Sequence, residues 1–409
     1  MQVVKMKRLM DYREYVGDAK VSELYRKATH LSDLHIVNIN STYYGGGVAE
    51  IMRNMTLLMD EMGLDVGWRA MIGNPDFFKI TKKFHNALQG DEINLTEMKK
   101  DVFEQTSEDF ASFTHLDHDI VVVHDPQPLP LITCYPKQQP WIWRCHIDLS
   151  DPYEEVWEYL KSFALAYDKY VFQMEDFAAE GFSNGHKIIR PSIDPLTTKN
   201  TDIGQSTIDK YLNDAGIDQD KPMIAQISRF DKWKDPSGVI EVFEKVKEEI
   251  DCQLVLCGSM ATDDPEGQEV YDRIRKKVNG RDDIHIIVDA PDIMVNSIQR
   301  SADVVLQKSL KEGFALTVSE ALWKETPVVG SNIGGIPTQI VDGKNGYLVN
   351  PNDYEAVAKK VMDILSDEQL KDEMGKKGRK RVQKKFLITR HIEDWMDSWL
   401  EISERERFI

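Results

Sequence analysis

Short apolar runs alternate with longer amphipathic stretches along this chain of 409 residues, and no other feature limits its fold as strongly. Short runs rich in Val and Ile are typical of buried strands, and the stretches between them are typical of helices that cover a parallel sheet. The pattern therefore predicts an α/β fold. The predicted strands are LHIVNI (34–39), DIVVVHD (119–125), WIWRCH (141–146), YVFQM (170–174), KIIRPSID (187–194), MIAQIS (223–228), QLVLCG (253–258), IHIIV (284–288), DVVLQ (303–307) and PVVG (327–330).

The alternation restarts in the middle of the chain. After KIIRPSID comes a polar, turn-rich segment, 195–207, and the next predicted strand begins only at Met223. We therefore place a domain boundary close to Pro191, which gives two Rossmann-like domains, 1–190 and 191–387. Open parallel sheets bind ligands at the carboxyl ends of their strands, so we expect the site in a cleft between two facing domains.

The two ends of the chain are predicted to be helical. Residues 1–33 precede the first convincing strand and look like a helical extension. The last predicted helix, about 390–404, carries Trp395, Trp399 and Leu400, an apolar stripe that needs a partner. We expect this helix to cross back to the first domain, so that about 388–409 belong with residues 1–190.

Composition excludes several classes of function. Lys and Arg number 51 and Asp and Glu number 69, so the net charge is 51 − 69 = −18, which disfavours nucleic acid as a partner. No apolar run approaches the ~18 residues of a membrane span, and the first residues lack the pattern of a signal peptide, so we expect a cytoplasmic protein. Four cysteines, none in a C-x-x-C pair, predict reduced thiols and no metal site: Cys134, Cys145, Cys252 and Cys257.

Three glycines, Gly45, Gly46 and Gly47, lie where a predicted strand turns into a helix. Glycine lets the backbone approach a ligand closely, and free N–H groups at a helix start attract negative charge. We expect Gly46 and Gly47 to contact a phosphate, although the same residues also suit a plain tight turn. The turn is not the G-x-G-x-x-G fingerprint, which counts against a nicotinamide oxidoreductase.

Two basic residues follow the first strand of the second half, in SRFDKWKDP. Arg229 and Lys234 lie five residues apart at a predicted carboxyl end. A forked guanidinium and a mobile ammonium there are suited to holding a diphosphate between them. The alternative is a solvated charged loop.

The segment KEGFALTVSEAL carries two carboxylates eight residues apart, Glu312 before a Gly-Phe turn and Glu320 inside the predicted helix. Both are placed to face one ligand at the start of that helix. We expect Glu312 and Gly313 to meet sugar hydroxyls and Glu320 to accept hydrogen bonds from ribose hydroxyls. Backbone N–H groups expected to meet phosphate belong to Phe314, Ala315, Leu316 and Thr317.

These motifs, together with the turn Gly334-Gly335-Ile336-Pro337, resemble the retaining glycosyltransferases of family 4, which have the two-domain GT-B fold. The resemblance covers essentially the whole chain, in the family's order. It implies that Arg229 and Lys234 bind the donor diphosphate. It also implies that Glu312 contacts the transferred sugar and Glu320 the nucleotide ribose.

The first half, with NSTYYGGGVAEI, HDPQ (124–127) and WRCHIDLSDP (143–152), is similar to the trehalose-forming branch of that family, the glycosyltransferring synthases and the related phosphorylases. This resemblance implies that His146 lies near the donor sugar's 6-hydroxyl and anomeric centre, so we take His146 and Glu312 as the catalytic candidates. A single His after a strand is otherwise a structural residue. Polar residues near predicted strand ends are the acceptor candidates: Asn40, Ser41, Thr42, His124, Asp125, Arg144 and Asp148. Of these, Asp125 and Asp148 also suit the capping of turns.

The expected reaction is retaining transfer of glucose from UDP-glucose or ADP-glucose to free glucose, which makes trehalose. We expect no tightly bound cofactor, Mg²⁺ only as a companion of the diphosphate, and a homodimer. Two alternatives keep the fold: a trehalose phosphorylase, or a family 4 glucosyltransferase with a different acceptor. Others come from different classes: a nucleotide-sugar epimerase, a nicotinamide oxidoreductase and a non-catalytic sugar-binding protein.

Overall fold

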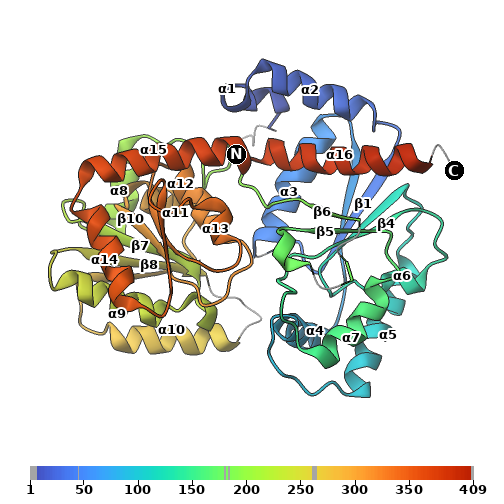
Figure 1. Cartoon of the computed structure of the whole chain (residues 1–409), viewed down its shortest axis with the longest axis horizontal. Helices are drawn as coiled ribbons and strands as arrows, with labels where there is room; N and C mark the ends of the chain where they lie inside the picture. Colours follow the sequence, from blue (N-terminus) through green and yellow to red (C-terminus); the bar gives the residue numbers. More distant parts are fainter. Residues whose placement is uncertain (1–6, 45, 179–180, 183–184, 260–264, 407–409) are drawn as a thin grey trace. The chain divides into compact units, whose positions relative to one another are not determined.

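The computed structural model describes residues 7–44, 46–178, 181–182, 185–259 and 265–406. The chain forms two compact units (Figure 1). The first comprises Met1–Pro191 and Ile388–Ile409, and the second comprises Ser192–Leu387. Gly45, the first glycine of the predicted turn, lies outside the described residues.

The first unit contains a six-stranded parallel sheet of order β2-β1-β3-β4-β5-β6. Its chain runs from β1 to β2 on one side and then returns to β3 on the other, so β1 and β3 flank a topological switch point. The strands are β1 (His35–Asn40), β2 (Asp65–Ala70), β3 (Ile120–His124), β4 (Trp141–Arg144), β5 (Lys169–Phe172) and β6 (His186–Ile188). The helical segments are η1 (Leu9–Tyr12), α1 (Arg13–Val16), α2 (Asp18–Thr29), α3 (Gly46–Glu61), α4 (Pro75–Ala87), α5 (Glu97–Phe113), α6 (Leu131–Cys134), α7 (Glu154–Ala164), η2 (Glu175–Phe177) and α16 (Ile388–Glu406).

The second unit repeats this architecture with the order β12-β11-β10-β7-β8-β9, also parallel. Here β7 and β10 flank the switch point. The strands are β7 (Met223–Arg229), β8 (Gln253–Ser259), β9 (Ile284–Val288), β10 (Val304–Gln307), β11 (Val328–Ser331) and β12 (Gly346–Val349). The helical segments are α8 (Gln205–Asp214), η3 (Lys232–Lys234), α9 (Pro236–Lys247), α10 (Pro265–Lys277), α11 (Asp292–Ser301), α12 (Leu316–Trp323), α13 (Ile336–Gln339), α14 (Tyr354–Leu365) and α15 (Glu368–Lys385).

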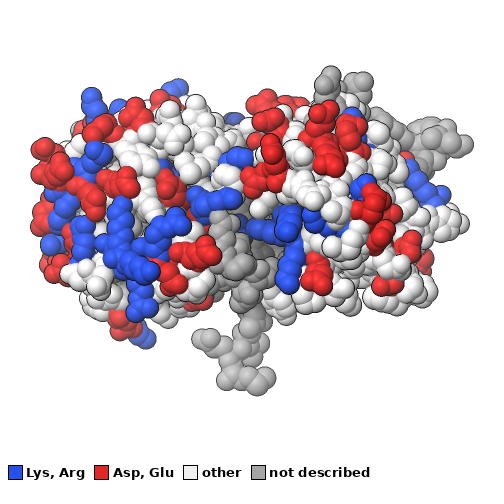
Figure 2. All heavy atoms as spheres, turned by 90° about the horizontal axis from the view of Figure 1, so that it is seen from below, with Lys and Arg blue, Asp and Glu red and all other residues white. Residues whose placement is uncertain are grey.

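Central strands of both sheets are buried because helices cover both of their faces, which confirms the α/β prediction. All ten predicted runs contain strands. Two further strands, β2 and β12, were not predicted; both lie at sheet edges, and β2 is half-buried and carries Asp65, Gly67 and Arg69, so it has no continuous apolar run. On the face seen in Figure 2, both acidic and basic side chains are exposed.

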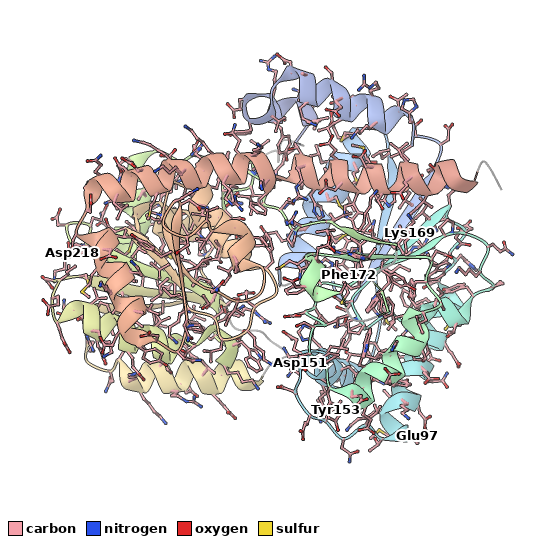
Figure 3. All side chains as sticks on the ribbon, viewed as in Figure 1. Glu97, Asp151, Tyr153, Lys169, Phe172 and Asp218 are labelled. Atoms are coloured by element: carbon pink, nitrogen blue, oxygen red, sulfur yellow. The ribbon has the colours of Figure 1, made fainter. Side chains whose placement is uncertain are left out.

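The last helix, α16, belongs to the first unit (Figure 1). Trp395 and Trp399 are both almost fully buried, with ring centroids 5.7 Å apart. Near the end of the helix, Glu401 accepts hydrogen bonds from Lys169 of β5, labelled in Figure 3, at 3.1 Å and from Lys187 of β6 at 2.8 Å. The helix is therefore held by an apolar stripe and by ion pairs with the sheet.

Candidate functional site

At the carboxyl edge of the first sheet, polar side chains from neighbouring strands meet beside the switch point. His124 ends β3, and its Nδ1 lies 3.0 Å from Nε2 of His146, which follows β4. The other nitrogen of His124, Nε2, lies 3.0 Å from Oδ1 of Asn38 in β1. The structure thus brings the predicted His124 and His146 together and adds Asn38 to them.

Both imidazole rings are neutral at pH 7. Burial, and to a lesser extent the positive charge of the neighbouring Arg144, lower the pKa of His124 to about 3. Burial, Arg144 and the two neighbouring histidines His124 and His391 also hold the pKa of His146 well below its ordinary value. The pair therefore offers hydrogen-bonding groups without a net charge.

Asp125 fixes the loop that carries His146. Its backbone is left-handed, with φ of 63°, and its Oδ1 accepts a hydrogen bond from the His146 N–H at 2.7 Å. Its carbonyl accepts a further bond from Trp143 Nε1 at 3.1 Å. Burial raises the pKa of Asp125 to about 7, against the His146 N–H and Arg144, which lower it. Asp125 is therefore a structural support of the loop after β4.

Arg144 is a fully buried cation at the end of β4. Its Nη2 donates to the carbonyl of Ile189 at 2.6 Å, while Nε and Nη1 have no hydrogen-bond partner among the described residues. Burial lowers the pKa of Arg144 to about 10, which still leaves the guanidinium protonated at neutral pH. The charge acts on the histidines through the low dielectric of the interior.

Other acceptor candidates have local partners. Asn40 donates to the carbonyl of Thr42 and accepts from Trp68 Nε1, each at 2.9 Å, and the Thr42 hydroxyl donates to the carbonyl of Tyr44 at 2.9 Å. Asp148 accepts from the N–H of Ser150 at 3.0 Å, which forms a turn. Ser41 is half-buried at the end of β1.

The glycine turn begins α3. Gly46 is exposed and has φ of 73°, a backbone that side chains rarely adopt, and Gly47 is half-buried. Nothing lies within 4 Å of where a Cβ of Gly46 would stand. The glycine is therefore required by the backbone conformation, and its surroundings are open.

In the second unit, Arg229 ends β7 at the switch point. Its side chain is 47% exposed, and Nη2 lies 3.3 Å from Oδ2 of the buried Asp231. Lys234 follows in η3, whose first turn is capped by the other carboxylate oxygen of Asp231. The two predicted basic residues thus come from one short loop, one half-exposed and one nearly buried.

Lys234 and Glu312 form a largely buried ion pair. Nζ of Lys234 lies 2.6 Å from Oε2 of Glu312, whose side chain is only 8% exposed. The same oxygen accepts hydrogen bonds from the Ser309 hydroxyl at 3.1 Å and from Gln307 Nε2 at 3.4 Å. All three donors bind Oε2, and no hydrogen bond to Oε1 is found among the described residues.

The turn after Lys234 is held by another buried cation. Asp235 has φ of 45°, caps α9 by accepting from the Gly238 N–H at 3.0 Å, and pairs with Lys308. Lys308 is fully buried, with Nζ 4.2 Å from the centre of the Tyr354 ring. Because Lys308 follows β10 directly, the strand end fixes the loop that carries Lys234.

Glu320 lies in the interior of the second unit. Its side chain is 4% exposed, with Oε1 3.3 Å from Nζ of Lys199 and Oε2 3.3 Å from Nε2 of Gln299. Burial raises its pKa, but the charges of Lys199 and Lys324 lower it more, so the net shift is downward. Glu320 is thus ionised and already has partners.

The segment between Glu312 and Glu320 packs against a turn that contains Gly334 and Gly335. The N–H of Gly335 donates to the carbonyl of Gly313 at 2.9 Å, and a Cβ on Gly335 would lie 2.8 Å from Cα of Phe314. Ala315 has φ of 64° and directly precedes α12, whose first residues are Leu316 and Thr317. The start of α12 is therefore held against the turn that contains Gly335.

Sequence reasoning missed several residues that hold the predicted ones in place. Asn38 and Gln307 could have been found as polar residues of apolar strands and Asp235 as part of SRFDKWKDP, whereas the others stand in segments with no motif. The missed residues are Asn38, Lys199, Asp235, Gln299, Gln307, Lys308 and Ser309.

The described residues include neither a metal-binding cluster nor a membrane-spanning helix. The described part of the chain contains no group of three or more His, Cys, Asp or Glu residues that could hold a metal ion. Among the described helices, none has the length and apolar character needed to cross a membrane. The four cysteines are free thiols, three of them buried.

Comparison with known proteins places the chain among glycosyltransferases. Residues 38–179 match the family described as trehalose synthase, N-terminal domain, and residues 207–381 match glycosyl transferases group 1. A trehalose synthase of Thermococcus litoralis is 46% identical over 96% of this chain and 96% of its own length, and one of Rubrobacter xylanophilus is 41% identical over 95% of each. A trehalose phosphorylase of Pleurotus pulmonarius is 28% identical over 95% of this chain and 60% of its own length.

Among solved structures, sucrose-phosphate synthase from Thermosynechococcus elongatus matches with a TM-score of 0.72 and 16% identity, covering 91% of this chain and 100% of that one. At this identity the likeness shows the fold alone. That fold confirms the expected GT-B architecture.

Proposed function

This chain belongs to the trehalose synthase family of glycosyltransferases, and we propose that it transfers glucose from a nucleoside-diphosphate glucose to free glucose with retention of configuration, forming trehalose. The donor is UDP-glucose or ADP-glucose. The curated relatives of similar length carry the name trehalose synthase, which supports the product. What we propose is the nucleoside-diphosphate glucose donor, the free glucose acceptor and the retained configuration.

The observation that carries the donor assignment is the Lys234–Glu312 pair at the switch point of the second sheet, where β7 also ends at Arg229. A leaving diphosphate needs positive charge and N–H donors, because negative charge builds up on it in the transition state. The half-exposed guanidinium of Arg229, the Lys234 ammonium and the start of α12 supply both. Glu312, held through Oε2, keeps Oε1 for a hydroxyl of the glucose being transferred.

The first unit would supply the groups around the sugar. A neutral His146 accepts or donates hydrogen bonds to hydroxyls and adds no charge that would oppose a developing oxocarbenium ion. In the retaining reaction we propose, the acceptor hydroxyl attacks on the face from which the diphosphate leaves, and its proton passes to a diphosphate oxygen. The C1–O bond to the diphosphate breaks as the new C1–O bond forms, so the atoms balance without a covalent enzyme intermediate.

Glu320 belongs to the nucleotide side of the proposal. Its ion pair with Lys199 keeps it ionised, and an ionised carboxylate accepts hydrogen bonds from ribose hydroxyls. The Glu320 side chain is 4% exposed, so ribose binding requires Lys199 or Gln299 to move away from the carboxylate.

One alternative has a specific observation behind it, the 28% identity to a trehalose phosphorylase. A phosphorylase would use the same cations for inorganic phosphate and would need no ribose contact. The two reactions are separated by parallel assays, one with UDP-glucose or ADP-glucose plus glucose, the other with glucose 1-phosphate plus glucose. Trehalose and free nucleotide from the first assay alone support the proposal. Trehalose and phosphate from the second alone would make the enzyme a phosphorylase, and no trehalose from either would point to another acceptor.

The remaining parts of the proposal concern what accompanies the enzyme. We propose that the enzyme has no tightly bound cofactor and that Mg²⁺ binds only together with the donor diphosphate. The protein is proposed to act in the cytoplasm as a homodimer. Gel filtration with light scattering, at several protein concentrations, tests the oligomeric state.

A further inference from the structure

Three side chains from three neighbouring strands, β1, β3 and the loop after β4, form one continuous chain of hydrogen bonds in the first unit. It runs from Asn38 Oδ1 to Nε2 of His124, and from Nδ1 of His124 to Nε2 of His146, with 3.0 Å at both steps. Asn38 and His124 are almost fully buried, and His146 is half-buried. We refer to these three residues as the histidine relay.

The positions of the protons in the histidine relay follow from its donors and acceptors. The Asn38 amide is oriented with Oδ1 toward His124, while its Nδ2 is buried without a hydrogen-bond partner among the described residues. In this orientation the amide oxygen only accepts, so Nε2 of His124 carries the hydrogen that binds Asn38. A neutral imidazole has one N–H, which makes Nδ1 of His124 an acceptor. Nε2 of His146 must then donate to it, and Nδ1 of His146 is left without a hydrogen.

The charges around the histidine relay keep each ring at a single proton. Arg144 is buried at the end of β4 and disfavours a second positive charge on either ring, and His391 of α16 acts on His146 in the same direction. Asp125 is the acid beside them, and its Oδ1 is bound to the backbone N–H of His146.

We infer that Asn38 and His124 are positioning residues that hold His146 in one tautomer, with a bare Nδ1 that accepts a hydrogen bond from a sugar hydroxyl. A lone pair on a neutral ring attracts a hydroxyl hydrogen and repels the oxygens of phosphates and carboxylates. The site around His146 therefore selects an uncharged part of a sugar. The contact of His146 with sugar rests on the proposed function, whereas the tautomer does not.

The tautomer is read directly by two-bond ¹H–¹⁵N NMR of the full chain labelled at its histidine rings, without substrate, at pH 7. His391 is the control in the same spectrum, because its Nδ1–H donates to the carbonyl of Arg190 at 2.8 Å and its Nε2 accepts from Trp395 at 3.2 Å. We expect opposite patterns for the two residues, a bare Nδ1 in His146 and a bare Nε2 in His391. A protonated Nδ1 in His146 overturns the inference.

Two substitutions test whether the relay sets the tautomer. In Asn38→Leu we expect His146 to become a mixture of tautomers while His391 is unchanged, and kcat to fall at least about tenfold while KM for the donor stays within about twofold. His124→Asn keeps an acceptor near the place of Nδ1 and should preserve the His146 tautomer better than His124→Leu. Ser107→Ala, a buried hydroxyl change in α5, is the control for polar substitutions in the same unit.

The outcomes separate this inference from the proposed function. A bare Nδ1 that survives Asn38→Leu unchanged overturns the role of Asn38, whatever the kinetics. A bare Nδ1 in a protein that makes no trehalose keeps the tautomer and overturns the proposed reaction. Unchanged kcat in Asn38→Leu, together with a mixed tautomer, overturns the claim that the relay serves turnover.

Discussion

The Lys234 ammonium lies 2.6 Å from the Glu312 carboxylate although 78 residues separate the two in sequence. β7 and β10 are neighbours in the second sheet, so the loops that follow them meet at its carboxyl edge. The Lys234 ammonium is suited to binding a phosphate, and the Glu312 carboxylate is suited to accepting a hydrogen bond from a hydroxyl. The donor assignment depends on this juxtaposition more than on either motif alone.

Removal of the cation from this pair should damage donor use. In Lys234→Met, Glu312 keeps a nearly buried charge with only neutral donors, and the diphosphate loses one positive partner, so kcat/KM for the nucleotide sugar should fall about 100-fold, or about 3 kcal/mol. Initial rates over a range of donor concentrations measure it. Lys232→Met in the same loop changes an exposed lysine over the Trp233 ring and should stay within about twofold. Equal effects of the two substitutions would contradict the assignment.

A methyl group on Gly335 should disturb the segment that links Glu312 to α12. The added Cβ would lie 2.7 Å from the carbonyl oxygen of Gly313 and 2.8 Å from Cα of Phe314, so the backbone of that segment must move. We expect Gly335→Ala to lower kcat/KM at least about tenfold, since displacement of catalytic groups by about 1 Å is costly. Gly204→Ala is the matched control, because nothing lies within 4 Å of its Cβ position. Full activity in Gly335→Ala would show that this turn does not position the site.

The apolar stripe of α16 should contribute strongly to the stability of the first unit. Trp399 is fully buried, and its replacement by alanine leaves a large cavity, so the free energy of unfolding should fall by about 3–5 kcal/mol. Urea unfolding followed by circular dichroism measures this change. Leu57→Ala removes an exposed leucine from α3 and should cost less than about 0.5 kcal/mol. Similar losses in both variants would mean that α16 is not anchored by its tryptophans.

The ion pairs of Glu401 predict a dependence of stability on pH. Hydrogen bonds from Lys187 and then Lys169 lower the pKa of Glu401 to about 2, from an ordinary value of 4.5. A lowered acid pKa stabilises the folded state fully above pH 4.5, and this contribution is lost as the pH falls toward 2. Because the side chain is 38% exposed, solvent screens the pairs and the contribution is below about 1 kcal/mol.

The test compares Glu401→Gln with the unmodified protein by urea unfolding between pH 7 and pH 3. We expect the difference in free energy of unfolding to be constant above about pH 5 and to shrink below it. A difference that grows as the pH falls would have the wrong sign for a carboxylate whose pKa is lowered in the folded state.

The sequence predicts central strands well because burial on both faces requires continuous apolar runs such as IVVV of β3. It misses β2 because DVGWRA carries Asp65, Gly67 and Arg69 and so has no apolar run, and it also misses the short edge strand β12. That α16 packs against a partner was predictable from its two tryptophans, since an apolar stripe must find a partner, but the stripe does not say which partner. Local pattern thus carries the architecture.

The site was predictable only in part. Residues at strand ends, such as Arg229 and His124, follow from the rule that parallel sheets bind ligands at their carboxyl edge. Their partners do not, because Lys199 reaches Glu320 across 121 positions and Asn38 reaches His124 across 86. Such pairs depend on strand order and register, which one sequence does not display.

The central claim is transfer of glucose from a nucleoside-diphosphate donor to free glucose with retention. It is tested most directly with donor whose glucose carries ¹³C at the anomeric carbon, together with unlabelled glucose, while NMR follows the labelled carbon. The account predicts that the label appears in trehalose in the α configuration, with release of one nucleoside diphosphate for each disaccharide. Label that appears in a β linkage or only in free glucose, or trehalose that forms only when glucose 1-phosphate replaces the nucleotide sugar, would contradict it.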